Sequence, residues 1–118
     1  MKTLTKYFKR KEFECFCGCG QDWVDYELML VLDMLRSHFN KPIKINSGSR
    51  CFNHNHKIGG SPHSQHLLGK AADIVVKDVK PQAVYDFLDA VFPDCYGIGL
   101  YNVQGFVHFD VRKNRARW

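Results

Sequence analysis

The sequence predicts a small α+β domain in which helices pack on one side of an antiparallel sheet. Two segments carry apolar side chains at helical spacing, residues 25–40 and a stretch that begins at Pro81. Four others read as strands, at 43–46, 71–76, 97–101 and 106–111. With 118 residues, 45% of them hydrophobic, the chain can bury one core without disulfides, so residues 1–118 are expected to form a single domain.

The first half supplies one helix, one strand and a loop. Asp25 is a residue type that caps helices, and the apolar stripe Leu28, Leu32, Leu35 and Phe39 runs to Asn40, where Lys41-Pro42 ends it. Residues 43–46 alternate as a short strand and lead into the turn Ser47-Gly48-Ser49-Arg50. Residues 53–62 are polar and contain glycines, which predicts an irregular loop.

The second half alternates strand, helix and hairpin. Residues 71–76 are β-branched and suit a strand, and Pro81 opens a helix whose buried stripe is expected to be Val84, Phe87, Leu88 and Val91. The strands at 97–101 and 106–111 are separated by four residues, which predicts a hairpin.

Charge and hydropathy limit the kinds of binding partner that the sequence predicts. The formal net charge of +5 arises largely at the two ends, from Lys2, Lys6, Lys9, Arg10 and Lys11 and from Arg112, Lys113, Arg115 and Arg117. Such ends favour an anionic partner such as nucleic acid, a membrane surface or an acidic cell-wall polymer, or they simply aid solubility. No apolar run has signal-peptide or membrane-span length. We therefore expect synthesis in the cytoplasm without membrane insertion, and delivery by another factor if the substrate lies outside.

Five cysteines cannot all pair within one chain, and a cytoplasmic origin makes reduced thiols the default. Cys15, Cys17 and Cys19 alternate, which differs from the spacing of a zinc knuckle. Cys51 or Cys95 could complete a metal site with them or form a bridge, whereas simple buried or half-buried thiols are the plainer interpretation.

Two histidines and an aspartate form a candidate catalytic metal site. Side chains alternate across a strand, so His108 and Asp110 share the face opposite the apolar Val107 and Phe109. The same parity separates Asp73 from its apolar neighbours, and a carboxylate in such a strand is costly unless it is paired or bound to metal. Gly69 would let the chain fold back and bring His66 to Asp73. The simpler alternative is two satisfied surface histidines and a capping aspartate.

Several spaced motifs resemble one family. Ser64-x-His66-x-x-Gly69-x-Ala71-x-Asp73 follows Ser47-Gly48-x-Arg50 and precedes Phe106-Val-His108-x-Asp110-x-Arg112. In this order they resemble the zinc D-Ala-D-Ala carboxypeptidases, a family that includes hedgehog-like domains and phage endolysins. The resemblance extends from about Phe13 to Trp118 and is closest to the short cell-wall peptidases of bacteriophages and prophages.

The resemblance implies roles for individual residues. His66, Asp73 and His108 would bind one zinc ion, and Arg50 would hold the substrate or the developing oxyanion, as a guanidinium can do through two parallel hydrogen bonds. Ser47 and His63 are the other predicted substrate contacts. The implied reaction is hydrolysis of an amide bond in peptidoglycan stem peptides or cross-links by an enzyme that we expect to be a monomer.

The proton-transfer residue is the weak point of the resemblance. Relatives place an acid three residues, or a histidine two residues, before the last zinc histidine, where this chain has Gly105 and Phe106. Asp110 is the first candidate for the base because it lies about 7 Å from His108 along the same strand face. It is equally suited to orient a ligand histidine. His63, a further alternative, lies in a loop.

Two other functions stay open at this point. Without a base, the domain would be a catalytically weak, zinc-containing module that binds the cell wall or serves a structural role. His54-Asn55-His56 spells the HNH of a nuclease family and the chain is basic, but HNH nucleases distribute those residues over a longer ββα-metal element. A nucleic-acid partner is therefore not expected.

Overall fold

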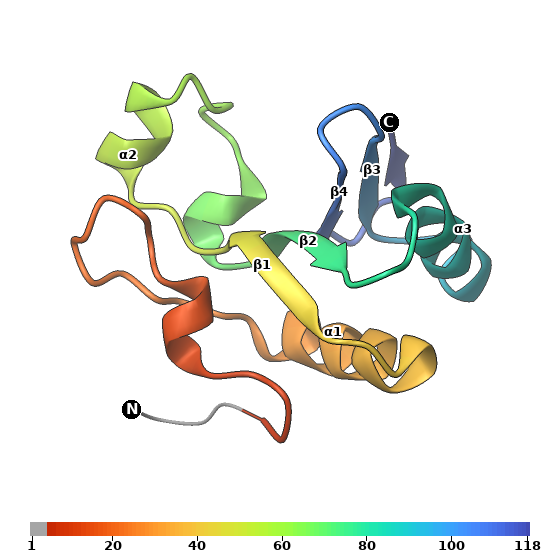
Figure 1. The fold of residues 1–118 in the computed structure, drawn as a ribbon. Helices are drawn as coiled ribbons and strands as arrows, with labels where there is room; N and C mark the ends of the chain where they lie inside the picture. The colour runs from red at the N-terminus through yellow and green to blue at the C-terminus, as the bar shows by residue number, and fades with distance from the viewer. Residues whose placement is uncertain (1–4) are drawn as a thin grey trace.

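A five-stranded sheet with helices beside it organises residues 5–118, the part of the chain that the computed structural model describes (Figure 1). Lys2 of the N-terminal basic group lies outside this part. In chain order the elements are the 3₁₀ helix η1 (Arg10–Phe13), α1 (Tyr26–Phe39), β1 (Ile43–Ser47), α2 (Phe52–Lys57), the 3₁₀ helix η2 (Gln65–Leu68), β2 (Ala71–Val76), α3 (Pro81–Val91), β3 (Gly97–Tyr101), β4 (Phe106–Asp110) and β5 (Ala116–Arg117).

The strand order is β1-β2-β4-β3-β5, and the first four strands pair antiparallel as predicted. The two-residue β5 pairs with β3 in parallel, so the sheet is mixed. A strand of two residues is too short to show a period of two in the sequence, which is why it was not predicted. The α+β class is confirmed.

Both long helices form where the sequence predicts them. The Asp25 carboxylate accepts a hydrogen bond from the Glu27 N–H at the start of α1, and Asn40 ends the helix in the left-handed conformation with φ 51°. Pro81 lies in the first turn of α3. Val84 and Leu88 are buried there, but Val91, the last residue of the helix, is 42% exposed and extends the predicted stripe too far.

The prediction of an irregular loop over 53–62 was wrong for its first half, which forms α2. The Cys51 sulfur accepts a hydrogen bond from the His54 N–H at the start of this helix. Asn55 is buried and bonded through its side chain to Arg50 and to the Ser61 carbonyl. Capping and a buried amide stabilise this polar helix, which lacks the apolar stripe by which a sequence predicts a helix.

Strand parity separates the core from the site. Alternate residues of β2 and β4, such as Ile74 and Phe109, join the apolar side chains of α1 and α3 in one core. The residues between them include Asp73 and His108, which are paired across the two strands. The face away from α1 and α3 therefore carries Asp73 and His108. Within residues 5–118, the structure contains no helix that is both long and apolar enough to cross a membrane.

Candidate metal centre

The three predicted ligands meet. Asp73 Oδ1 lies 3.0 Å from Nδ1 of His108 and 3.4 Å from Nε2 of His66. The β2–β4 register brings Asp73 and His108 together, whereas His66 arrives from η2. All three residues are buried, with 2% to 8% of their surface exposed.

The turn around η2 aims the His66 ring. The Ser64 hydroxyl accepts a hydrogen bond from the His66 N–H, and Gly69 ends the turn at φ 68°. A Cβ at Gly69 would fall 2.6 Å from the Trp23 carbonyl oxygen, so glycine is required both for the conformation and for the close approach. His66 Nδ1 lies 2.7 Å from the Gly48 carbonyl oxygen, to which it can only donate. Nε2 is thereby left free to bind metal.

The His108 ring is oriented from the other side. Its Nε2 lies 2.7 Å from Oδ2 of Asp110, and the N–H donated there leaves Nδ1 as the free nitrogen facing Asp73. Burial opposes a charge on this imidazole, but the hydrogen bonds to Asp110 and Asp73 outweigh it and raise the pKa of His108 above its usual value.

Asp110 is enclosed. It has no exposed surface, and its oxygens accept hydrogen bonds from the backbone N–H of Arg112 at 3.1 Å and from two guanidinium nitrogens of Arg112 at 2.8 and 2.6 Å. Burial raises the pKa of Asp110, but the bonds from His108 and Arg112 lower it well below its usual range. A Cβ on the neighbouring Gly97 would lie 2.5 Å from both carboxylate oxygens. Of its two predicted roles, this enclosure favours orienting His108 over facing substrate as a base.

Asp73 is also held ionised. Burial raises its pKa, but in the metal-free protein hydrogen bonds from His108 and His66, donated by the nitrogens that would otherwise bind metal, lower it well below the usual range of a carboxylate. Its second oxygen, Oδ2, lies 3.6 Å from Nη2 of Arg50. The Arg50 guanidinium also donates to Ser47 Oγ at 3.3 Å and to Asn55 Oδ1 at 3.2 Å. Burial lowers the pKa of Arg50, an effect that Asp73 opposes.

These donors fit a catalytic zinc ion. Tetrahedral ligands about 2.0–2.1 Å from zinc are separated from one another by about 3.3–3.4 Å, close to the two distances measured here. Two imidazoles and one carboxylate are the mixed donor set of catalytic zinc, which keeps a fourth position for water or substrate. The residues therefore fit the metal that the sequence predicts.

A cavity of about 530 Å³ opens beside the ligands. His66, Asp73 and His108 line it, together with Arg50, Gly60, Ser61, His63, Ser64, Gln65, Tyr101, Phe106, Arg112 and Trp118. Of the predicted substrate contacts, Arg50 and His63 thus reach the cavity. Ser47 is instead the hydrogen-bond acceptor behind Arg50.

One wall of the cavity was not predicted. Trp118 donates its indole N–H to the Tyr101 hydroxyl at 2.9 Å, and the Arg112 guanidinium lies 5.2 Å from the Trp118 ring. A Cβ on Gly99 would overlap the Trp118 indole. Neither an isolated aromatic residue nor a strand glycine carries a sequence signal for this role. Asn55, which positions Arg50, was also missed, because a single asparagine in a polar segment carries no sequence signal for such a role.

In this chain, the two positions at which relatives carry the catalytic base are occupied by residues that cannot accept a proton, Gly105 and Phe106. Gly105 lies in the turn between β3 and β4 with φ 86°, and Phe106 is part of the cavity wall. Among the cavity-lining residues of the described chain, Asp73 has the only carboxylate side chain.

The HNH triplet forms no metal site of its own. His54 and His56 lie on α2, and Asn55 between them is turned to Arg50. Within residues 5–118, two groups of potential metal ligands occur, and neither includes His54 or His56.

Comparison with known proteins agrees with the geometry. No curated protein sequence matches the chain significantly. A family model described as peptidase M15 matches residues 6–110, a range that includes all three candidate ligands. Because this match covers most of the chain, the protein belongs to the peptidase M15 family, the zinc D-Ala-D-Ala carboxypeptidase family that its motifs resemble.

Proposed function

We propose that the protein is a zinc-dependent peptidase that hydrolyses an amide bond in peptidoglycan stem peptides or their cross-links, as a carboxypeptidase or an endolysin-like endopeptidase. The observation that carries the proposal is the convergence of His66, Asp73 and His108 beside an open cavity. Because such a substrate lies outside the cytoplasm, the proposal includes release or delivery of the enzyme by another factor.

The chain's residues divide the work. A zinc ion held by the three ligands would supply a Lewis acid that polarises the scissile carbonyl and lowers the pKa of a bound water. Arg50 stays charged, is held by Ser47 and Asn55, and reaches the cavity, so it is suited to grip a substrate carboxylate or developing oxyanion. We assign Asp110 the orientation of His108.

His63 is our candidate for proton transfer. It lines the cavity and is the one imidazole there outside the ligand set, within the described residues. An imidazole can accept a proton from water and return it to a leaving amine near neutral pH. Replacing His63 with Gln should lower turnover at saturating zinc and leave zinc affinity unchanged.

A carboxylate-bearing substrate suits the charges at the cavity. Arg50 and Arg112 both line it, and stem peptides carry free carboxylates. Two other arginines of the basic C-terminal group, Arg115 and Arg117, contribute less to this positive charge than the sequence implies. Arg117 is bonded to Asp89 and to backbone carbonyls, and Arg115 lies near the same carboxylate.

The test is incubation of zinc-loaded protein with defined muropeptides, followed by mass spectrometry. We expect a cleavage product from the wild type, none from His66→Ala, and wild-type turnover from His56→Ala, a histidine variant outside the cavity. The mass lost identifies the bond. If the zinc-loaded wild type releases no product from any of these muropeptides, the enzymatic proposal fails.

One observation favours a second candidate, a catalytically weak zinc module that binds cell wall. The only carboxylate side chain among the described cavity-lining residues is a candidate ligand, which leaves no acidic side chain free for proton transfer. Such a module would co-sediment with purified peptidoglycan in a zinc-dependent manner and release no product from it.

A further inference from the structure

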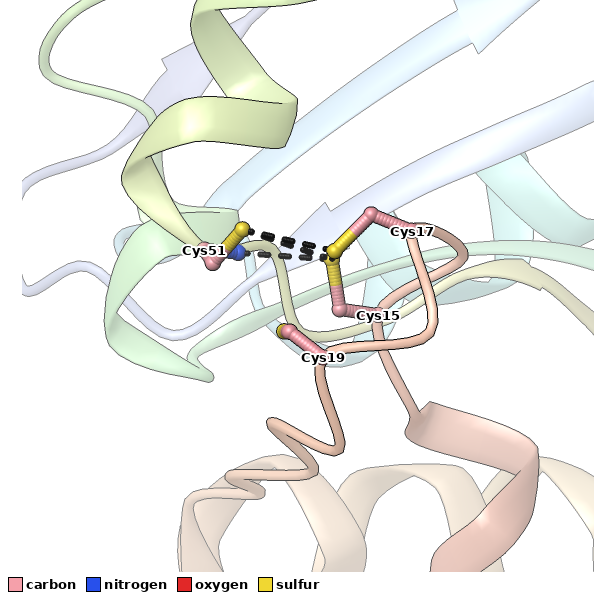
Figure 2. A group of neighbouring side chains, drawn as sticks. All are labelled: Cys15, Cys17, Cys19 and Cys51. Carbon is pink, nitrogen blue, oxygen red and sulfur yellow. Dashed lines mark hydrogen bonds between the residues drawn. The ribbon is translucent and has the colours of Figure 1, made fainter.

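We propose that Cys15, Cys17, Cys19 and Cys51 bind a second zinc ion as a closed structural site, which ties the N-terminal segment to the loop that carries Arg50. The four side chains, all free thiols, form the other group of potential metal ligands, apart from His66, Asp73 and His108 (Figure 2). The role is independent of catalysis.

The sulfur positions match the size of a zinc ion. The Sγ atoms of Cys15 and Cys17 are 3.6 Å apart, and they lie 3.9 and 3.6 Å from Sγ of Cys51. Four sulfurs placed tetrahedrally at about 2.3 Å from zinc would be about 3.8 Å apart. Cys19 completes the group, since all four sulfurs lie within 4.8 Å of one another.

The local backbone accounts for this convergence despite the unusual spacing. Gly18 and Gly20, on either side of Cys19, adopt φ 83° and 88°, which side-chain-bearing residues rarely do, and they curl the segment that carries the cysteines. The Cys15 N–H donates to the Gln21 carbonyl at 2.7 Å and closes the loop. Figure 2 shows Cys51 at the start of α2, across from this loop. The alternating spacing differs from that of a zinc knuckle, which is why spacing alone argued against a site. In an extended strand three such cysteines would share one face but spread over about 13 Å, too far apart to bind one ion.

Backbone N–H groups surround the sulfurs as they do around metal-bound thiolates. The Cys51 N–H lies 3.5 Å from Sγ of Cys15, the His54 N–H 3.3 Å from Sγ of Cys51, and the Gln21 N–H 3.5 Å from Sγ of Cys19. Donors of this kind orient ligands and stabilise their negative charge. Four thiolates without a cation would repel one another, whereas a bound divalent ion that accepts soft ligands offsets half of their charge and attracts each of them.

A disulfide explains the cluster less well. Bonded sulfurs are about 2.05 Å apart, whereas the three measured pairs here lie at similar, longer distances with no preferred partner. Four protein ligands also leave no position open, which is the arrangement of structural rather than catalytic zinc.

The site would support the catalytic loop. The Gln21 side chain donates to Ser49 Oγ at 2.9 Å and to the Arg50 carbonyl at 2.8 Å. Cys51 follows Arg50 directly in the sequence. Arg50 would therefore be held on its N-terminal side by the Gln21 hydrogen bond to Ser49 and on its C-terminal side by the metal bound to Cys51. Before α1, the described chain has only the short η1 helix as a regular element, so a bound metal would add to the Gln21 hydrogen bonds in anchoring the loop at 14–21.

Metal analysis of the full-length protein tests the proposal. We expect two zinc ions per chain in the wild type, because the structure has two ligand groups, and one in either His66→Ala or Cys17→Ser. Cys95→Ser should keep both, since Cys95 is outside the cluster and serves as the matched control.

Cobalt substitution tests the site in the wild-type protein, so its result does not depend on the folding of a cysteine variant. Cobalt in a tetrathiolate site absorbs strongly in the near ultraviolet by thiolate-to-metal charge transfer, whereas histidine and aspartate ligands give no such band. Wild type and His66→Ala should both show the band at full intensity. Its absence from both, iron in place of zinc, or a mass two hydrogens lighter from a disulfide among these cysteines would overturn the proposal. None of these results depends on peptide cleavage.

Discussion

Replacing Asp110 with Asn tests whether this carboxylate orients His108 or acts as the base. The Asp110 carboxylate accepts four hydrogen bonds, one from His108 and three from Arg112. An amide can accept only through its oxygen. If that oxygen takes the place of Oδ2, the bond to His108 survives and an N–H faces the Arg112 donors. If it takes the place of Oδ1, an N–H faces His108.

The second arrangement would change the tautomer of His108. Nε2 would have to accept, so the proton would move to Nδ1, the nitrogen that faces Asp73 and the metal position. Loss of such a partner typically weakens metal affinity by about 10–100-fold, or about 1.4–2.8 kcal/mol. Breaking a buried pair costs about 3–5 kcal/mol of folding stability, and because Arg112 is 35% exposed we expect about 2 kcal/mol.

The assays are zinc titration against a competing chelator and muropeptide turnover at saturating zinc. We expect Asp110→Asn to bind zinc about 10–100-fold more weakly and to recover most of its turnover when zinc saturates. Asp89→Asn is the control, because Asp89 also pairs with an arginine, Arg117, away from the cavity. Unchanged zinc affinity together with a turnover about 10²–10⁴-fold lower would refute the reasoning and make Asp110 the base.

Three more predictions concern the same site. Folding lowers the pKa of Asp73, so its contribution to the stability of the metal-free protein should be complete above about pH 4 and should be lost as the pH falls further. The midpoint of urea unfolding should therefore be lower at about pH 3 than at about pH 5, and equal midpoints would contradict the prediction. Asn55→Ala should lower kcat/KM about 10-fold by freeing the guanidinium that it holds, whereas its neighbour variant His54→Ala should match wild type; equal values for both would exclude a positioning role. Gly99→Ala should cost about 1–3 kcal/mol in chemical denaturation, and adding Trp118→Ala should relieve that cost, whereas strictly additive effects would mean that the two residues do not clash.

The metal ligands could be predicted because the spaced motifs resemble those of a known family, and backbone periodicity agrees for the two ligands that lie on strands. Alternation along β2 and β4 is a local property, so it separates Asp73 and His108 from the core without knowledge of the fold. The same rule placed Asp110 on the face of His108. It could not show that Arg112 and Gly97 enclose that carboxylate. The enclosure depends on the tertiary pairing of β3 with β4, which places Gly97 beside Asp110.

The features that were missed depend on side-chain contacts and on irregular backbone, neither of which a sequence pattern reports. Asn55 is buried because it bonds to Arg50 and to Ser61, and nothing in a polar, glycine-flanked segment signals that burial. The cysteine cluster requires left-handed glycines and a partner from α2, 36 residues from Cys15. Predictions from residue spacing assume regular helix or strand geometry. They are therefore wrong in segments where left-handed residues make the backbone irregular.

The two walls of the cavity differ in how freely they can evolve. The segment 47–51 already serves several partners, since Gly48 orients His66, Arg50 bonds to Ser47 and Asn55, and Cys51 belongs to the sulfur cluster. An insertion or deletion there would disturb all of these contacts together. The wall built from Tyr101, Phe106 and Trp118 borders the same space without contributing a candidate ligand. Substrate preference can therefore diverge, or be engineered, at the aromatic wall while the segment 47–51 stays constant.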